Sequence, residues 1–81
     1  MASIYFIDVP DYAPLWESAV GDSDVEVGRS GSHVEVSFPD GLTIDRAATG
    51  VRHAIWYSGV AALRDATVVR FDKEALRVEA V

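Results

Sequence analysis

The stretch DRAATGVRHAIWYSGVAALRD, residues Asp45 to Asp65, decides how this chain is interpreted. It is rich in alanine and its apolar side chains recur at helical spacing, so we expect one long helix here. One face of that helix would carry small or aliphatic side chains suited to lying close on a sheet: Ala47, Ala48, Val51, Ala54, Ile55, Ser58 and Ala62. Gly50 and Gly59 predict close packing of the helix or, at Gly50, a later helix start near Thr49.

The opposite face of the expected helix is too apolar and aromatic for an ordinary solvated surface. It would carry Arg52, His53, Trp56, Tyr57, Val60, Leu63 and Arg64. Three uses of this face remain open: packing against Leu15 and Trp16 of an earlier helix, a seam between two copies of the chain, or one wall of a ligand pocket. Aromatic rings and arginine are enriched at interface centres, and we take the following residues as the predicted contact surface: Arg52, His53, Trp56, Tyr57 and Val60.

The rest of the chain alternates strand-like and helical patterns. Predicted strands cover 3–9, 24–29, 32–38, 42–45, 67–72 and 76–81, and a short amphipathic helix that buries Leu15 and Trp16 covers 11–20. We expect the strands of residues 24–45 to form a meander, and the last two to form a hairpin that buries Val69 and Phe71. The predicted class is α+β, in one domain of residues 1–81. Its order is β-α-β-β-β-α-β-β, a mainly antiparallel sheet of five to six strands with two helices on one face.

Charge is distributed unevenly along the 81 residues, whose formal net charge is −6. Residues 1–45 hold nine acids against the single cation Arg29, whereas residues 46–81 hold four acids against six cations. Because a nucleic-acid partner needs a clustered positive surface, we expect no nucleic-acid binding. The chain has no cysteine and no apolar run of about 20 residues, and it opens without the pattern of a signal peptide. We therefore expect a soluble cytoplasmic protein with no membrane association.

Chemical motifs are weak throughout the sequence. Asp22, Asp24 and Glu26 resemble the start of a calcium loop, but the glycine and the final glutamate of such a loop are missing. His33 and His53 lack the spacing of a zinc site. We therefore expect no metal, no cofactor and no catalytic residue.

These observations favour a non-catalytic interaction or accessory module that acts through the aromatic helix face and the acidic first half, either as a homodimer or as an accessory subunit that binds a basic protein. Two alternatives stay open. One is a small-molecule-binding protein or enzyme whose pocket is lined by His53, Trp56, Tyr57, Asp8 and Glu17. The other is an acidic inhibitor or immunity-type protein that neutralises a basic partner through the acidic first half.

Overall fold

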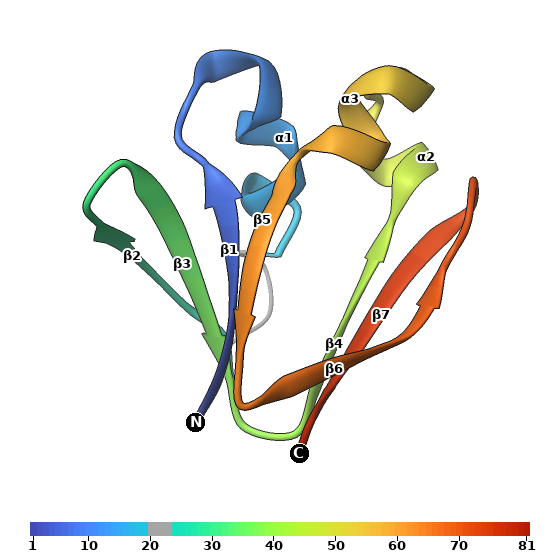
Figure 1. Cartoon of the computed structure of the whole chain (residues 1–81). Coiled ribbons are helices and arrows are strands. Elements are labelled where there is room, and N and C mark those ends of the chain that lie inside the picture. Colours follow the sequence, from blue (N-terminus) through green and yellow to red (C-terminus); the bar gives the residue numbers. More distant parts are fainter. Residues whose placement is uncertain (20–23) are drawn as a thin grey trace.

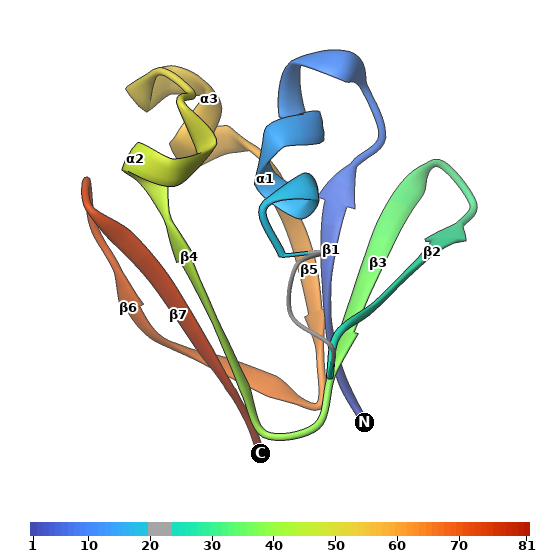
Figure 2. The same ribbon diagram turned by 180° about the vertical axis from the view of Figure 1, so that it is seen from behind.

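A computed structural model describes residues 1–19 and 24–81 of the chain. Two antiparallel sheets diverge from one end of the molecule like the arms of a V, and the helices lie at the open end (Figure 1). Both termini lie at the closed end, where the chain crosses between the sheets (Figures 1 and 2). The inner faces of the two arms and the helices between them therefore share one apolar interior.

The first sheet has four strands in the order β2-β3-β1-β5, and the second has three in the order β4-β7-β6. Their bounds are β1 Ala2–Ile7, β2 Glu26–Ser30, β3 His33–Phe38, β4 Gly41–Asp45, β5 Val60–Arg64, β6 Ala66–Phe71 and β7 Ala75–Ala80. The chain passes from the first sheet to the second twice, at Pro39-Asp40 between β3 and β4 and at Asp65 between β5 and β6. Asp65 has a positive φ of 54°, a left-handed conformation that aspartate tolerates better than most residues.

In residues 1–19 and 24–81, four short helical segments occupy the open end. They are the 3-10 turn η1 Pro10–Tyr12, α1 Ala13–Glu17, α2 Arg46–Thr49 and α3 His53–Ser58. Pro10 and Pro14 each stand at the start of their segment, where a missing amide N–H costs nothing. The Asp45 carboxylate caps α2 by accepting from the amide of Ala47. None of the described helices is both long and apolar enough to span a membrane.

The core joins the inner faces of both sheets to one side of the helices. Ile4 and Phe6 of β1 lie opposite Val36 and Val34 of β3, and all four side chains are buried. The remaining buried apolar residues come from both sheets and from the helical end: Ala2, Leu15, Trp16, Ala19, Phe38, Leu42, Ile44, Trp56, Leu76 and Val78. The two tryptophans thus close the open end of the V, one from α1 and one from α3.

The α+β class and the mainly antiparallel pairing are confirmed, as is the burial of Leu15 and Trp16. The prediction of a single sheet of five to six strands is replaced by seven strands in two sheets among the residues that the structure describes. The meander prediction was also wrong, because β4 leaves β3 at the Pro39-Asp40 turn and pairs with β7 instead. The predicted helix of 11–20 becomes η1 followed by α1, and its last residue, Val20, lies outside the described residues.

The long helix expected over Asp45–Asp65 was wrong. The segment forms α2, α3 and the strand β5, and Gly50 ends α2 in the left-handed conformation, with φ of 72°. The Thr49 hydroxyl reinforces this break, because it donates to the Arg46 carbonyl and accepts from the Val51 amide. Gly59 ends α3 and is buried, as its predicted close packing requires.

Val69 was predicted to be buried and is 52% exposed. The β6–β7 register shifts between Val68 and Arg70, so that Val69 is an extra residue on β6, a β-bulge. A bulge breaks the alternation of inward and outward side chains. Phe71, beyond the bulge, does pack against the core as predicted.

Candidate functional site

The predicted contact residues are distributed over α3 and the strand that follows it. Arg52 is the N-cap residue of α3, His53 begins the helix, and both are exposed. Val60, the first residue of β5, is half-buried opposite Phe6 of β1. The face predicted on one helix is therefore divided between a helix and a strand, and its members have different exposures.

Trp56 is a core residue in this structure and not an exposed contact. Its side chain is 1% exposed, and its ring meets that of Phe71 edge to face, with centroids 5.8 Å apart. The indole Nε1 donates a 2.6 Å hydrogen bond to the carbonyl oxygen of Asp72 in the β6–β7 turn. Trp56 thus holds α3 on the end of the second sheet through Phe71 and Asp72, whereas the partners expected from the sequence were Leu15 and Trp16.

Tyr57, the next residue, is 50% exposed. Its ring packs on Phe71 with centroids 5.3 Å apart, so Phe71 contacts both aromatic rings of α3. The α3–β6 corner is defined here as Arg52, His53, Tyr57, Phe71 and Lys73. In this corner the half-exposed ring of Tyr57 packs on the half-buried ring of Phe71, which in turn contacts the buried ring of Trp56.

The corner also carries positive charge. Arg52 and Lys73 are exposed, and in the described ranges 1–19 and 24–81 neither side chain forms an ion pair. Arg46 is held differently, because its guanidinium donates to the carbonyls of Lys73 and Val51 and so ties α2 to the β6–β7 turn. Two cations of the corner are therefore available for a partner. Arg52 directly precedes α3, and Lys73 lies in the turn that follows β6.

Asp72 organises the turn that supports the corner. Its carboxylate accepts a 2.7 Å bond from Nε of Arg70 and bonds of 2.9 Å from the amides of Glu74 and Ala75. The Arg70 guanidinium, followed by the two amides, lowers the pKa of Asp72 from 3.8 to about 2. The charged carboxylate is the form that the folded turn prefers.

This preference predicts how the turn responds to acid. Because the pKa of Asp72 is lower in the folded chain, its contribution to stability is complete above pH 3.8 and is lost as the pH falls toward 2. The melting temperature of Asp72→Ala should therefore lie below that of the wild type at neutral pH, and the difference should shrink between about pH 5 and pH 2. Thermal unfolding followed by circular dichroism across this range measures it. A difference that stays constant with pH would assign the loss to something other than the carboxylate.

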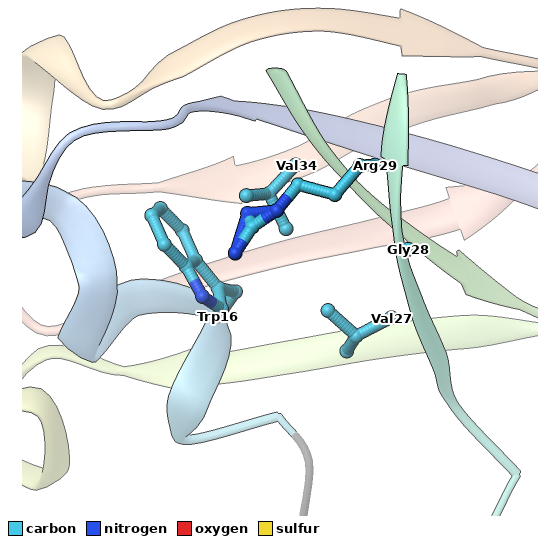
Figure 3. Close-up of a pocket in the computed structure, with 5 residues that line it drawn as sticks. All are labelled: Trp16, Val27, Gly28, Arg29 and Val34. Atoms are coloured by element: carbon cyan, nitrogen blue, oxygen red, sulfur yellow. The ribbon is translucent and has the colours of Figure 1, made fainter. Parts of the chain in front are cut away.

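The residues predicted for a ligand pocket line neither of two hollows in the described surface. One hollow, of about 180 Å³, is lined by Trp16, Val27, Gly28, Arg29 and Val34; the other, of about 310 Å³, is lined by Met1, Ala2, Pro39, Asp65, Ala80 and Val81. The Arg29 side chain extends toward the indole of Trp16 in the first (Figure 3). Asp8 forms a 2.9 Å ion pair with this Arg29, and Glu17 is exposed on α1. The first hollow is smaller than the usual range of ligand pockets, about 300–1,000 Å³.

A polar cluster on the outer face of the first sheet was missed by the sequence reasoning. Glu35 of β3 accepts hydrogen bonds from the hydroxyls of Ser3 and Tyr5 of β1, at 2.8 and 3.1 Å. Tyr5 also raises the pKa of the Arg64 guanidinium on β5 by hydrogen bonding. Only the strand register brings these residues together, since β1, β3 and β5 are far apart in the chain. The carboxylate is occupied by its neighbours, so the cluster ties three strands together.

Comparisons with known proteins found no similarity: no family model, no curated protein and no solved structure matches this chain. Residues 1–19 and 24–81 contain no group of three or more histidine, aspartate or glutamate side chains arranged to hold a metal ion. The Asp22 side chain of the calcium-like string lies outside the described residues. The α3–β6 corner is thus the candidate site considered further, because ring contacts and a hydrogen bond hold its exposed tyrosine in place.

Proposed function

We propose that this chain is a small non-catalytic interaction module that binds a protein, a second copy of itself included, through the α3–β6 corner. The observation that carries the proposal is the placement of Tyr57. Half of its surface is exposed while its ring is held against Phe71. A tyrosine that is already immobilised loses little conformational entropy when a partner covers it.

The support beneath Tyr57 strengthens this interpretation. Trp56 is buried and hydrogen-bonded to the Asp72 carbonyl, so α3 is held on the second sheet at the residue beside Tyr57. Arg52 and Lys73 add exposed cations, and tyrosine and arginine are both enriched among the residues that dominate binding energy. A partner that presents carboxylates to this corner fits it best by charge.

Substitution of Tyr57 by alanine tests the proposal. We expect association with a partner or a second copy to weaken by about 2 kcal/mol, roughly 30-fold in Kd, because the ring lies at the centre of the contact. Self-association is measured by sedimentation velocity, and partner binding by quantitative capture on the immobilised chain. Trp56→Ala is not suitable here, since it would disturb the core.

Val27→Ala is the matched control, because Val27 is 40% exposed on β2 and belongs to the other sheet. It should leave association unchanged. If Tyr57→Ala and the wild type associate with equal affinity, with both variants folded, the corner is not the contact surface and the proposal fails.

A further inference from the structure

The strand β6, Ala66–Phe71, forms an open edge of the second sheet. It pairs with β7 on one side only, since the order of that sheet is β4-β7-β6. Thr67, Val68, Val69 and Arg70 are all exposed, Val68 at 40% and Val69 at 52%. An edge strand that exposes adjacent β-branched side chains is a template for pairing with another strand.

Hydrogen bonds at the two ends of β6 show which backbone groups are free. The Val81 amide donates to the Asp65 carbonyl, and the Asp72 amide donates to the Ala75 carbonyl. In an antiparallel pair, every second residue directs its backbone N–H and C=O groups to the partner strand. Because Asp65 bonds to Val81, Thr67 also directs these groups to β7. Because Asp72 bonds to Ala75, Arg70 does so as well. The alternation counted from Asp65 and that counted from Asp72 differ by one residue, which is the bulge at Val69. Ala66 and Val68 therefore direct their N–H and C=O groups to the open edge.

We propose that a second copy of the chain occupies this edge, with β6 antiparallel to β6 about a two-fold axis at Thr67. In this register Ala66 of each copy lies opposite Val68 of the other. Both residues have free backbone groups, so the pairing forms four hydrogen bonds across the axis. The inference rests on the proposed function, because it specifies the partner of an interaction module whose corner includes Phe71 at the end of the same strand.

Charge complementarity favours a second copy over an unrelated strand. The same register places Asp65 of one copy opposite Val69 of the other, next to Arg70, and the two-fold axis repeats this pair. Asp65 and Arg70 are both exposed. Nε of Arg70 binds Asp72 and one terminal nitrogen lies 3.9 Å from Glu74, so the other terminal nitrogen is the one left for Asp65 of the second copy. The strand thus carries an acid and a base at the positions where self-pairing brings opposite charges together.

Other edges of the two sheets are less suited to pairing. Gly28 lies in the middle of the outer strand β2, and Arg29 on that strand is already paired with Asp8. Ala61 and Ala62 occupy the exposed middle of β5, with little side-chain surface to bury. Of the edges in the described part of the chain, β6 offers the longest run of exposed β-branched residues.

Sedimentation velocity of the whole chain over a wide range of concentration tests the inference, with Val68→Pro as the principal variant. Proline removes the outward N–H of Val68 and leaves the bonds between β6 and β7, since Val68 does not donate to β7. We expect a wild-type dimer whose Kd rises at least tenfold in this variant. Val68→Thr retains the N–H and the branched side chain and should stay dimeric. Hydrogen exchange should show the Ala66 and Val68 amides protected in the dimer and open at low concentration.

Thr67→Lys is the second variant, in case Val68→Pro does not fold. It changes an exposed side chain and places two lysines together at the axis, so it should also weaken the dimer at least tenfold. A wild-type chain that is monomeric at every concentration overturns the inference, and so does a dimer that survives Thr67→Lys. A dimer weakened by Tyr57→Ala but not by Thr67→Lys overturns it as well, while it supports the proposed function. The two proposals therefore fail separately.

Discussion

Trp56→Ala is expected to destabilise the chain by about 3–5 kcal/mol, the usual loss when a large buried aromatic side chain is truncated. Three contacts are lost together: the edge-to-face contact with Phe71, the hydrogen bond to the Asp72 carbonyl, and the apolar packing of a side chain that is 1% exposed. Few neighbours can close the cavity, because Phe71 is also held by Tyr57. Urea unfolding followed by tryptophan fluorescence and circular dichroism measures the change.

Tyr57→Ala is the control for this prediction, since it removes a neighbouring ring from the same helix. Tyr57 is half-exposed and contacts Phe71 from the outside, so its loss should cost only about 1 kcal/mol, the value of one ring pair. Equal losses in the two variants would contradict the different roles that the structure gives to adjacent residues.

Gly59→Ala is expected to cost about 1–3 kcal/mol, as overpacking of a core does. A Cβ atom at Gly59 would lie 2.3 Å from Cδ1 of Leu15 and 3.0 Å from Cδ1 of Tyr12. Leu15 is 1% exposed, so it has no free space into which to move. The carbonyl of Gly59 also accepts the Ile7 amide, which limits any shift of the backbone. Urea unfolding measures the loss.

Gly41→Ala separates packing from the general effect of adding a methyl group. A Cβ atom there would lie 2.2 Å from a terminal nitrogen of Arg77, which is even closer than the contact at Gly59. The Arg77 side chain is flexible and 37% exposed, however, and it can swing into solvent. Gly41→Ala should therefore lie within about 0.5 kcal/mol of the wild type, as surface substitutions do. A loss as large as that of Gly59→Ala would mean that Arg77 is fixed.

Local patterns predicted much of this fold. Strict alternation located β3 and β7, and apolar spacing placed Leu15 and Trp16 in the core. The sheet arrangement was not accessible in the same way, because nothing local to Leu42 and Ile44 distinguishes pairing with β3 from pairing with β7. That choice depends on partners more than 30 residues away.

The strand β5 was hidden by a bulge. Val60 and Leu63 are both half-buried and lie opposite Phe6 and Ile4, although three positions separate them in the sequence. The register shifts at this point, and the extra residue is Ala61. Inward side chains then recur at i and i+3, as they would on a helix, and two alanines strengthen that impression. Sequence periodicity alone therefore assigned to a helix a segment that β1 holds as a strand.

The candidate site was predicted in part. Tyr57, Arg52 and His53 are exposed on one helix, whereas Trp56 is buried only because Phe71 and Asp72 fold back over it from another element. The two aromatic residues are adjacent in the sequence and have similar chemistry. The difference between them arises from a hairpin that begins nine residues after Tyr57, and no local pattern encodes it.

The strand orders also bear on how this chain is made. The first strand, β1, is central in one sheet and the last, β7, is central in the other. During synthesis, one edge of β1 stays unpaired until β5 has been made. The strand β4 is made long before its only partner, β7. The first sheet gains its full set of backbone bonds only after β5 has left the ribosome, and the second only after β7 has, because long-range pairing must await both strands. The edges of β1 and β4 in the nascent chain are therefore covered late.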